Sequence, residues 1–133
     1  FPSTTLFRSI VRLAKKVLSK TDEPSGLRDT EITAKAVFDA VKAGDEAAQE
    51  TAKRFGEILC KGLAMIASVL NPAAFVIGGG VSKAGEILFD FIRPPFEKYV
   101  FAGSRDAKFV LATLGNDAGI YGAAKLVLDV GRE

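Results

Sequence analysis

Hydrophobic residues recur at helical spacing in five stretches of the chain and form short unbroken runs in two others. Helical spacing predicts a helix with one apolar face, whereas a short unbroken run predicts a strand that is covered on both faces. The helical stretches are residues 10–20, 30–43, 46–70, 84–100 and 117–130, the fourth interrupted by Pro94-Pro95, and the strand-like runs are residues 73–77 and 109–114. The predicted order is therefore helix, helix, helix, strand, helix, strand, helix.

Residues with known preferences at helix ends mark several of these boundaries. Either Asp29 or Thr30 is placed to cap the second helix, and Asp45 is placed to cap the third. Gly44 stands where helices commonly end in a left-handed residue. The third helix ends at Asn71-Pro72. Its broad apolar stripe consists of Phe55, Leu59, Leu63, Ile66, Val69 and Leu70.

Strands that alternate with helices indicate an α/β fold in which helices cover a parallel sheet. Typical sheets have more than two strands, so we expect the remaining strands to lie upstream and the chain to be a fragment. The first nine residues, FPSTTLFRS, have no clear amphipathic period and resemble the translation of a common sequencing-adapter oligonucleotide. We expect residues 1–9 to be non-native and the genuine protein to enter at Ile10.

Candidate chemistry is concentrated where the first predicted strand ends. Gly78, Gly79 and Gly80 follow that strand directly, and such a turn exposes backbone N–H groups at the sheet edge where open α/β proteins bind ligands. The turn completes neither the phosphate-binding pattern GxxxxGK[ST] nor the dinucleotide pattern GxGxxG. On spacing alone, a tight strand-to-helix turn without a ligand is an equally good interpretation. Ser82 and Lys83 are placed either to approach phosphates or to begin a helix as solvated residues.

Composition argues against several function classes. The 133 residues include no histidine and one cysteine, which removes Ser-His and Cys-His nucleophile pairs, the usual zinc sites and internal disulfides. Lys and Arg number 18 against 16 Asp and Glu, a net charge of +2 that is mixed along the chain, so no basic stripe favours nucleic acid. No apolar run reaches the roughly 18 residues that a membrane-spanning helix needs, and the first residues lack the basic-then-apolar pattern of a signal peptide. We expect a cytoplasmic protein that binds neither nucleic acid nor membranes.

Two motifs carry a family resemblance. They are NPAAFVIGGGVSKAGE, residues 71–86, and ATLGNDAGIYGAAKLVL, residues 112–128. Together they resemble the carboxyl-terminal half of sugar kinases of the ROK family (repressors, open reading frames and kinases), most of all its bacterial glucokinases, and the likeness runs from Ile10 to Val130. The resemblance implies that residues 10–133 form the carboxyl-terminal, nucleotide-side lobe of an actin-like ATPase (ribonuclease H-like) fold. ATP would lie between two lobes, with the sugar held mainly by the amino-terminal half.

The resemblance also implies roles for individual residues. The three glycines and Val81 match the family's adenosine motif, where the backbone lies against ATP. Gly119 and Gly122 match the small-residue face of the closing helix, for which packing and hinge roles are implied. No catalytic residue and no metal ligand are expected in this chain, because the family's catalytic Asn-Asp-Ala stands upstream.

The remaining candidates have plainer interpretations. Asn116-Asp117 opens the final helix, where capping is a better interpretation than catalysis. Cys60 lies near the apolar side of the long helix, and we expect a small buried hydrophobe there rather than a reactive thiol. Asp90 and Glu97 are interpreted as ordinary surface carboxylates.

The implied activity is that of an ATP-dependent glucokinase of carbohydrate metabolism and glycolysis, with Mg²⁺ as the counter-charge for phosphoryl transfer. The family's Asp-Gly-Gly-Thr phosphate motif, its sugar-contacting Glu-x-Gly-His and its Cys-x-Cys-Gly-x-x-Gly-Cys zinc loop would all precede Ile10. We therefore expect this fragment alone to be inactive. Two alternatives stay open: a kinase for fructose or N-acetylmannosamine, and a sugar-responsive transcriptional repressor with an upstream helix-turn-helix domain. The family also implies a homo-oligomer for the intact protein.

Overall fold

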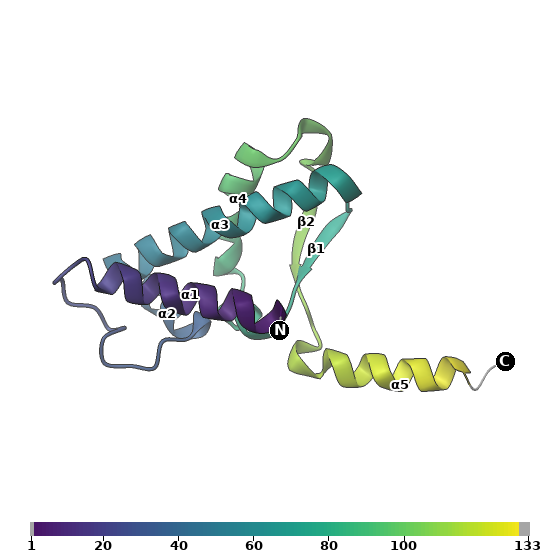
Figure 1. Ribbon diagram of the computed structural model, residues 1–133, viewed down its shortest axis with the longest axis horizontal. Helices are drawn as coiled ribbons and strands as arrows, with labels where there is room; N and C mark the ends of the chain where they lie inside the picture. The colour runs from purple at the N-terminus through teal and green to yellow at the C-terminus, as the bar shows by residue number, and fades with distance from the viewer. Residues whose placement is uncertain (1, 131–133) are drawn as a thin grey trace.

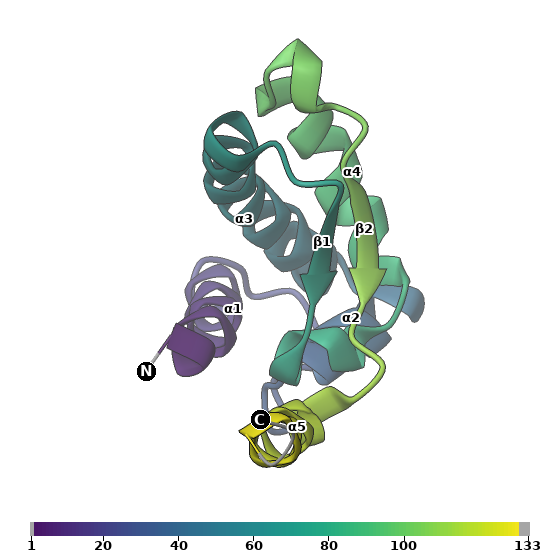
Figure 2. The same cartoon turned by 90° about the vertical axis from the view of Figure 1, so that its right-hand side faces the viewer.

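The chain alternates helices and two strands in the order that the sequence predicts (Figures 1 and 2). A computed structural model describes residues 2–130. The elements are α1 (Pro2–Leu18), α2 (Ala34–Lys42), α3 (Glu46–Leu70), β1 (Ala74–Ile77), the 3₁₀ helix η1 (Gly79–Ala84), α4 (Ile87–Tyr99), the 3₁₀ helix η2 (Ala102–Ser104), β2 (Lys108–Leu111), the 3₁₀ helix η3 (Gly115–Asp117) and α5 (Ala118–Val130). The three 3₁₀ helices are features that hydrophobic spacing did not predict.

Helix α1 is longer than predicted. It begins at Pro2 and not at Ile10, so the expected helix start was wrong. Proline is favoured at the first position of a helix, because the N–H that it lacks would have no partner there. Ile10, Ala14 and Val17 are buried and attach the helix to the core.

The start of α2 also differs from the prediction. Thr33 caps this helix, and its hydroxyl oxygen accepts a hydrogen bond from the Ala36 N–H at 3.0 Å. The predicted caps, Asp29 and Thr30, lie in the loop before it. The Thr30 hydroxyl instead donates to the Gly26 carbonyl oxygen at 3.1 Å. Side chains of this type serve turns as readily as caps, and here the loop uses the first threonine and the helix the second.

Helix α3 begins and ends where the sequence predicts. Asp45 accepts a hydrogen bond from the Ala48 N–H at 3.0 Å, which confirms the predicted cap. Gly44 has a φ of 85°, the left-handed conformation expected of it. At the other end Asn71 is left-handed, with a φ of 43°.

The apolar stripe predicted on α3 is only partly covered. Exposure rises along the helix: Phe55 is buried, Leu59 and Leu63 are half-buried, and Ile66, Val69 and Leu70 are exposed. The side that is buried in the carboxyl-terminal half carries the small residues Cys60, Ala64 and Ala67. α3 and α4 pack against each other, and small residues allow such helices to approach closely.

The two strands form a parallel pair, as predicted (Figure 2), and their register sets Phe75 opposite Phe109. Both aromatic rings contact Phe96 of α4, at centroid distances of 5.8 and 4.9 Å. The expectation that both faces would be covered was wrong for this chain, because Val76 is 67% exposed and Val110 41%. Only the face toward α4 belongs to the core.

Helix α4 runs without interruption through Pro94 and Pro95, so the predicted break was wrong. The predicted start at Ala84 was wrong as well, because that residue ends η1. Two interior prolines are costly for a helix. Leu88 and Phe96 are buried on the core side of α4, and this packing offsets the cost.

Helix α5 projects away from the other elements (Figure 1). Its described side chains are all exposed, including Ile120 at 70% and Val127 at 73%. No helix within residues 2–130 is long and apolar enough to cross a membrane.

Candidate functional site

The two sequence motifs meet at the carboxyl ends of the strands. The Ala112 N–H donates to the Ile77 carbonyl oxygen at 2.8 Å, just beyond the paired residues. A Cβ atom added to Gly78 would lie 3.3 Å from the Cβ of Ala112. Further along, η3 packs against η1. The structure therefore places the glycine turn directly beside the start of the second motif.

The glycine turn leads into a 3₁₀ helix and not into an α-helix. Gly78 is extended and Gly79 is left-handed, with a φ of 72°, a conformation that favours glycine. Gly85, with a φ of 80°, ends the 3₁₀ helix in the same region. This sharp geometry accounts for glycine at both ends of the segment.

The side chain of Val81 faces the core. Val81 is 5% exposed and Ala84 3%, and the segment that carries them, η1, packs against α2. Of the four residues matched to the adenosine motif, Val81 could therefore offer a ligand its backbone but not its side chain. Its side chain instead anchors the glycine turn to the helices.

Ser82 and Lys83 differ in whether their polar side-chain groups are free to bind a ligand. The Ser82 hydroxyl donates to the Gly79 carbonyl oxygen at 2.7 Å and so closes the turn on itself. The Lys83 side chain is exposed. None of the ion pairs found within residues 2–130 includes it. Of the two, only the lysine presents an unused polar group.

The second motif contributes a turn and the start of α5. Gly115 is left-handed, with a φ of 56°, and the Asp117 N–H donates to the Leu114 carbonyl oxygen at 3.1 Å. Asp117 directly precedes α5 and is exposed; that its side chain caps the helix stays a prediction. A Cβ atom added to Gly119 or Gly122 would meet nothing within 4 Å, so the small-residue face of α5 is open.

Cys60 is a buried structural residue, as predicted. Its thiol donates to the Ile92 carbonyl oxygen of α4, with Sγ and O 2.9 Å apart. Burial raises the pKa of this thiol to about 12, although the backbone of Phe96 acts in the opposite direction. A thiol with so high a pKa is protonated at neutral pH and is a poor nucleophile. Asp90 and Glu97 are exposed on α4, as expected of surface carboxylates.

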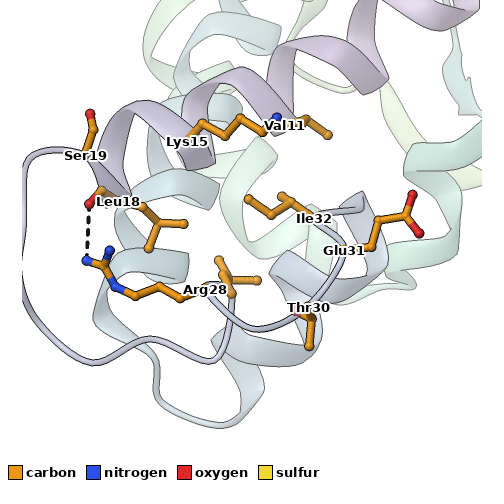
Figure 3. A pocket seen from close by; sticks show the side chains of 9 residues that line it. Val11, Lys15, Leu18, Ser19, Arg28, Thr30, Glu31 and Ile32 are labelled. Atoms are coloured by element: carbon orange, nitrogen blue, oxygen red, sulfur yellow. Dashed lines mark hydrogen bonds between the residues drawn. The ribbon is translucent and has the colours of Figure 1, made fainter.

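A cavity of about 690 Å³ lies away from the glycine turn, between α1 and the loop that leads to α2 (Figure 3). Arg28 is one of the polar residues that line it, and sequence reasoning did not single it out. Its Nε donates to the Glu23 carbonyl oxygen at 3.3 Å, and its Nη2 donates to the carbonyl oxygens of Leu18, at 3.2 Å, and Thr21. The guanidinium therefore holds the loop against the end of α1.

Residues 2–130 contain no group of three or more His, Cys, Asp or Glu side chains that could hold a metal ion. The two motifs offer a ligand the backbone of the glycine turn and the exposed Lys83 beside it.

Comparison with known proteins gives a family model, described as the ROK family, that matches residues 8–130. The chain is 45% identical over 97 residues to a glucokinase of Halalkalibacterium halodurans, an alignment that covers 72% of this chain and 29% of that protein.

Comparison with solved structures also finds proteins of the ROK family. A ROK family glucokinase from Streptomyces griseus in complex with glucose and AMPPNP is 34% identical, with a TM-score of 0.77, and the match covers 90% of this chain and 41% of that one. A ROK family transcriptional regulator, a homologue of the Escherichia coli MLC protein, shares the fold at 24% identity, with a TM-score of 0.62 over 75% of this chain and 25% of its own. The chain thus spans less than half the length of these relatives.

Proposed function

The chain belongs to the ROK family and has the α/β fold of its actin-like sugar kinases, and on that premise we propose that it is the carboxyl-terminal, nucleotide-side lobe of an ATP-dependent glucokinase. The observation that carries the proposal is the glycine turn, Gly78 to Gly80, at the carboxyl end of β1 beside the second motif. The similarity to two proteins named glucokinase, one solved with glucose and AMPPNP, supports it.

In this proposal the chain binds ATP through backbone atoms. The glycines leave the edge of the sheet free of side chains, so a nucleotide can lie directly against the main chain. The buried Val81 side chain fixes the turn to the helices beneath it. Phosphoryl transfer depends on positioning and on electrostatic stabilisation, and a rigid turn contributes the positioning of the donor.

The remaining parts of the reaction are assigned to residues outside this chain. Mg²⁺, when bound, neutralises charge on the transferred phosphoryl group. Residues 2–130 contain no group of three or more His, Cys, Asp or Glu side chains that could hold a metal ion, and in this proposal the protein ligands of Mg²⁺ lie upstream. The catalytic base, the sugar contacts and the family's zinc loop likewise belong upstream in this proposal. The whole enzyme is proposed to work in the cytoplasm as a homo-oligomer, as the family resemblance implies.

Glucose is proposed over fructose and N-acetylmannosamine because glucokinases are found among the chain's relatives at 45% and 38% identity, above the 32% of N-acetyl-D-glucosamine kinases from Vibrio species. A sugar-responsive repressor is the second candidate. The intact glycine turn favours the kinase, because a protein that only regulates transcription has less need of a nucleotide.

The proposal is tested by reading the gene upstream of the codon for Ile10 and assaying the whole encoded protein for ATP-dependent phosphorylation of the three sugars. We expect Asp-Gly-Gly-Thr, Asn-Asp and Glu-x-Gly-His upstream, with glucose the best substrate. An upstream helix-turn-helix together with no phosphorylation of any of the three sugars would overturn the kinase. The same reading tests our proposal that residues 1–9 are non-native, which a continuous native frame through Phe1 would contradict.

A further inference from the structure

The 3₁₀ helix η1 sorts its side chains into three columns, because a 3₁₀ helix has three residues per turn and residues three apart lie one above the other. Val81 and Ala84 form the buried column. Gly79 and Ser82 form the second, joined by the hydrogen bond from the Ser82 hydroxyl to the Gly79 carbonyl oxygen. The third column consists of Gly80 and Lys83, of which Lys83 is exposed.

We propose that Lys83 binds a phosphate group of the nucleotide whose adenosine lies against the glycine turn, an inference that rests on the proposed function. The three-residue period places Lys83 one turn above Gly80, which has no side chain to stand between the ammonium group and a bound molecule. An ammonium group binds phosphate oxygens as a point charge. Lys83 thus adds to the affinity for the charged part of ATP, beside the upstream phosphate motif, while the glycine backbone contacts the uncharged part.

The surroundings leave the ammonium group of Lys83 available. Glu86 is the nearest acidic residue along the chain, but it lies beyond Gly85, whose φ of 80° breaks the column. Asp117 belongs to η3, the element that packs against η1 from the second motif. Neither carboxylate forms an ion pair with Lys83 within residues 2–130. The Ser82 hydroxyl donates its proton to the Gly79 carbonyl oxygen and so does not donate it to the phosphate.

The test compares Lys83→Gln with the unchanged whole protein, using calorimetric titration of ATP, ADP, AMP and adenosine. We expect binding of the phosphorylated nucleotides to weaken by about tenfold or more, as for loss of a hydrogen bond to a charged group, and binding of adenosine to stay the same. Lys83→Arg should restore most of the lost affinity. Lys98→Gln, an exposed lysine on α4 beside Tyr99, is the matched control and should bind all four ligands normally.

Two results would overturn the inference: unchanged ATP affinity in Lys83→Gln, or an equal loss for adenosine and ATP, which would indicate a disturbed turn. Both leave the proposed function standing. Failure of the unchanged protein to bind any of the four ligands would overturn the proposed function and the inference with it.

Discussion

Gly56 marks a close crossing of α3 and α4. A methyl group on its Cα would lie 2.1 Å from the carbonyl oxygen of Phe91 and 2.9 Å from the carbonyl carbon, far inside van der Waals contact. Alanine in place of glycine favours a helix by about 1 kcal/mol, whereas overpacking a core costs about 1–3 kcal/mol and sometimes more. Because the clash is with backbone atoms, which cannot move aside, we expect the overpacking cost to lie at the upper end of this range. We expect Gly56→Ala to lower the free energy of unfolding by about 2 kcal/mol net.

Gly62 provides a matched control on the same helix, because an added Cβ there would meet nothing within 4 Å. Gly62→Ala should therefore raise the free energy of unfolding by about 0.5–1 kcal/mol. Both variants of the 133-residue chain would be compared with the unchanged chain by urea unfolding, followed by helical circular dichroism. The reasoning is refuted if Gly56→Ala is as stable as the unchanged chain, or if both substitutions change stability by the same amount.

Three further predictions concern the Cys60 thiol, the Asp45 cap and the activity of the isolated chain. Burial raises the pKa of Cys60 from 9.0 to about 12, so a thiol reagent should label only the unfolded chain, and stability should fall between these pH values, where only the unfolded thiol ionises. Labelling of folded protein would contradict this. Burial acts to raise the pKa of Asp45, but hydrogen bonds from the Ala48 N–H, the Ser25 hydroxyl and the Gly26 N–H outweigh it and lower that pKa. Asp45→Ala should therefore cost about 1 kcal/mol at neutral pH, and urea unfolding at several pH values should show this cost shrinking as the pH falls through the lowered pKa. Under our proposal the isolated 133-residue chain forms only half of the cleft and cannot position both substrates, so it should form no glucose 6-phosphate from ATP and glucose in a coupled assay; product above background would refute this.

Local chemistry made α3 predictable. Its cap at Asp45, the left-handed Gly44 before it and the stop at Asn71 all depend on residues within one or two turns of the helix end. The prediction of the α2 cap was wrong because Thr30 and Thr33 have the same chemistry. Only the conformation of the folded loop decides which of the two threonines caps the helix.

Burial was predicted less well than secondary structure. Val76 and Val69 belong to apolar patterns that indicate covered faces, yet both are exposed here. A hydrophobic pattern reflects all the contacts that a segment makes in the whole protein. This chain spans less than half the length of its relatives. Under our proposal, the covering elements belong to the remainder.

The candidate site was predictable in position but not in detail. Parallel strands end at the same edge of a sheet, so the meeting of the two motifs followed from the predicted topology. The Val81 side chain points inward because η1 has three residues per turn. The hydrophobic spacing of the sequence did not predict this 3₁₀ helix. The loop-closing role of Arg28 depends on three carbonyl oxygens that approach one another only in the folded chain.

The two prolines inside α4 have a consequence for the order of folding. Pro94 and Pro95 offer no N–H to the preceding turn, and an interior proline costs a helix about 3 kcal/mol. A short helix with this handicap does not form in isolation. α3 has no proline, a capped start and 25 residues, so it can form early, and α4 is then expected to coil against it as the Cys60 thiol reaches the Ile92 carbonyl oxygen. We therefore expect α3 to act as the template in the folding of this chain, with α4 forming on its surface.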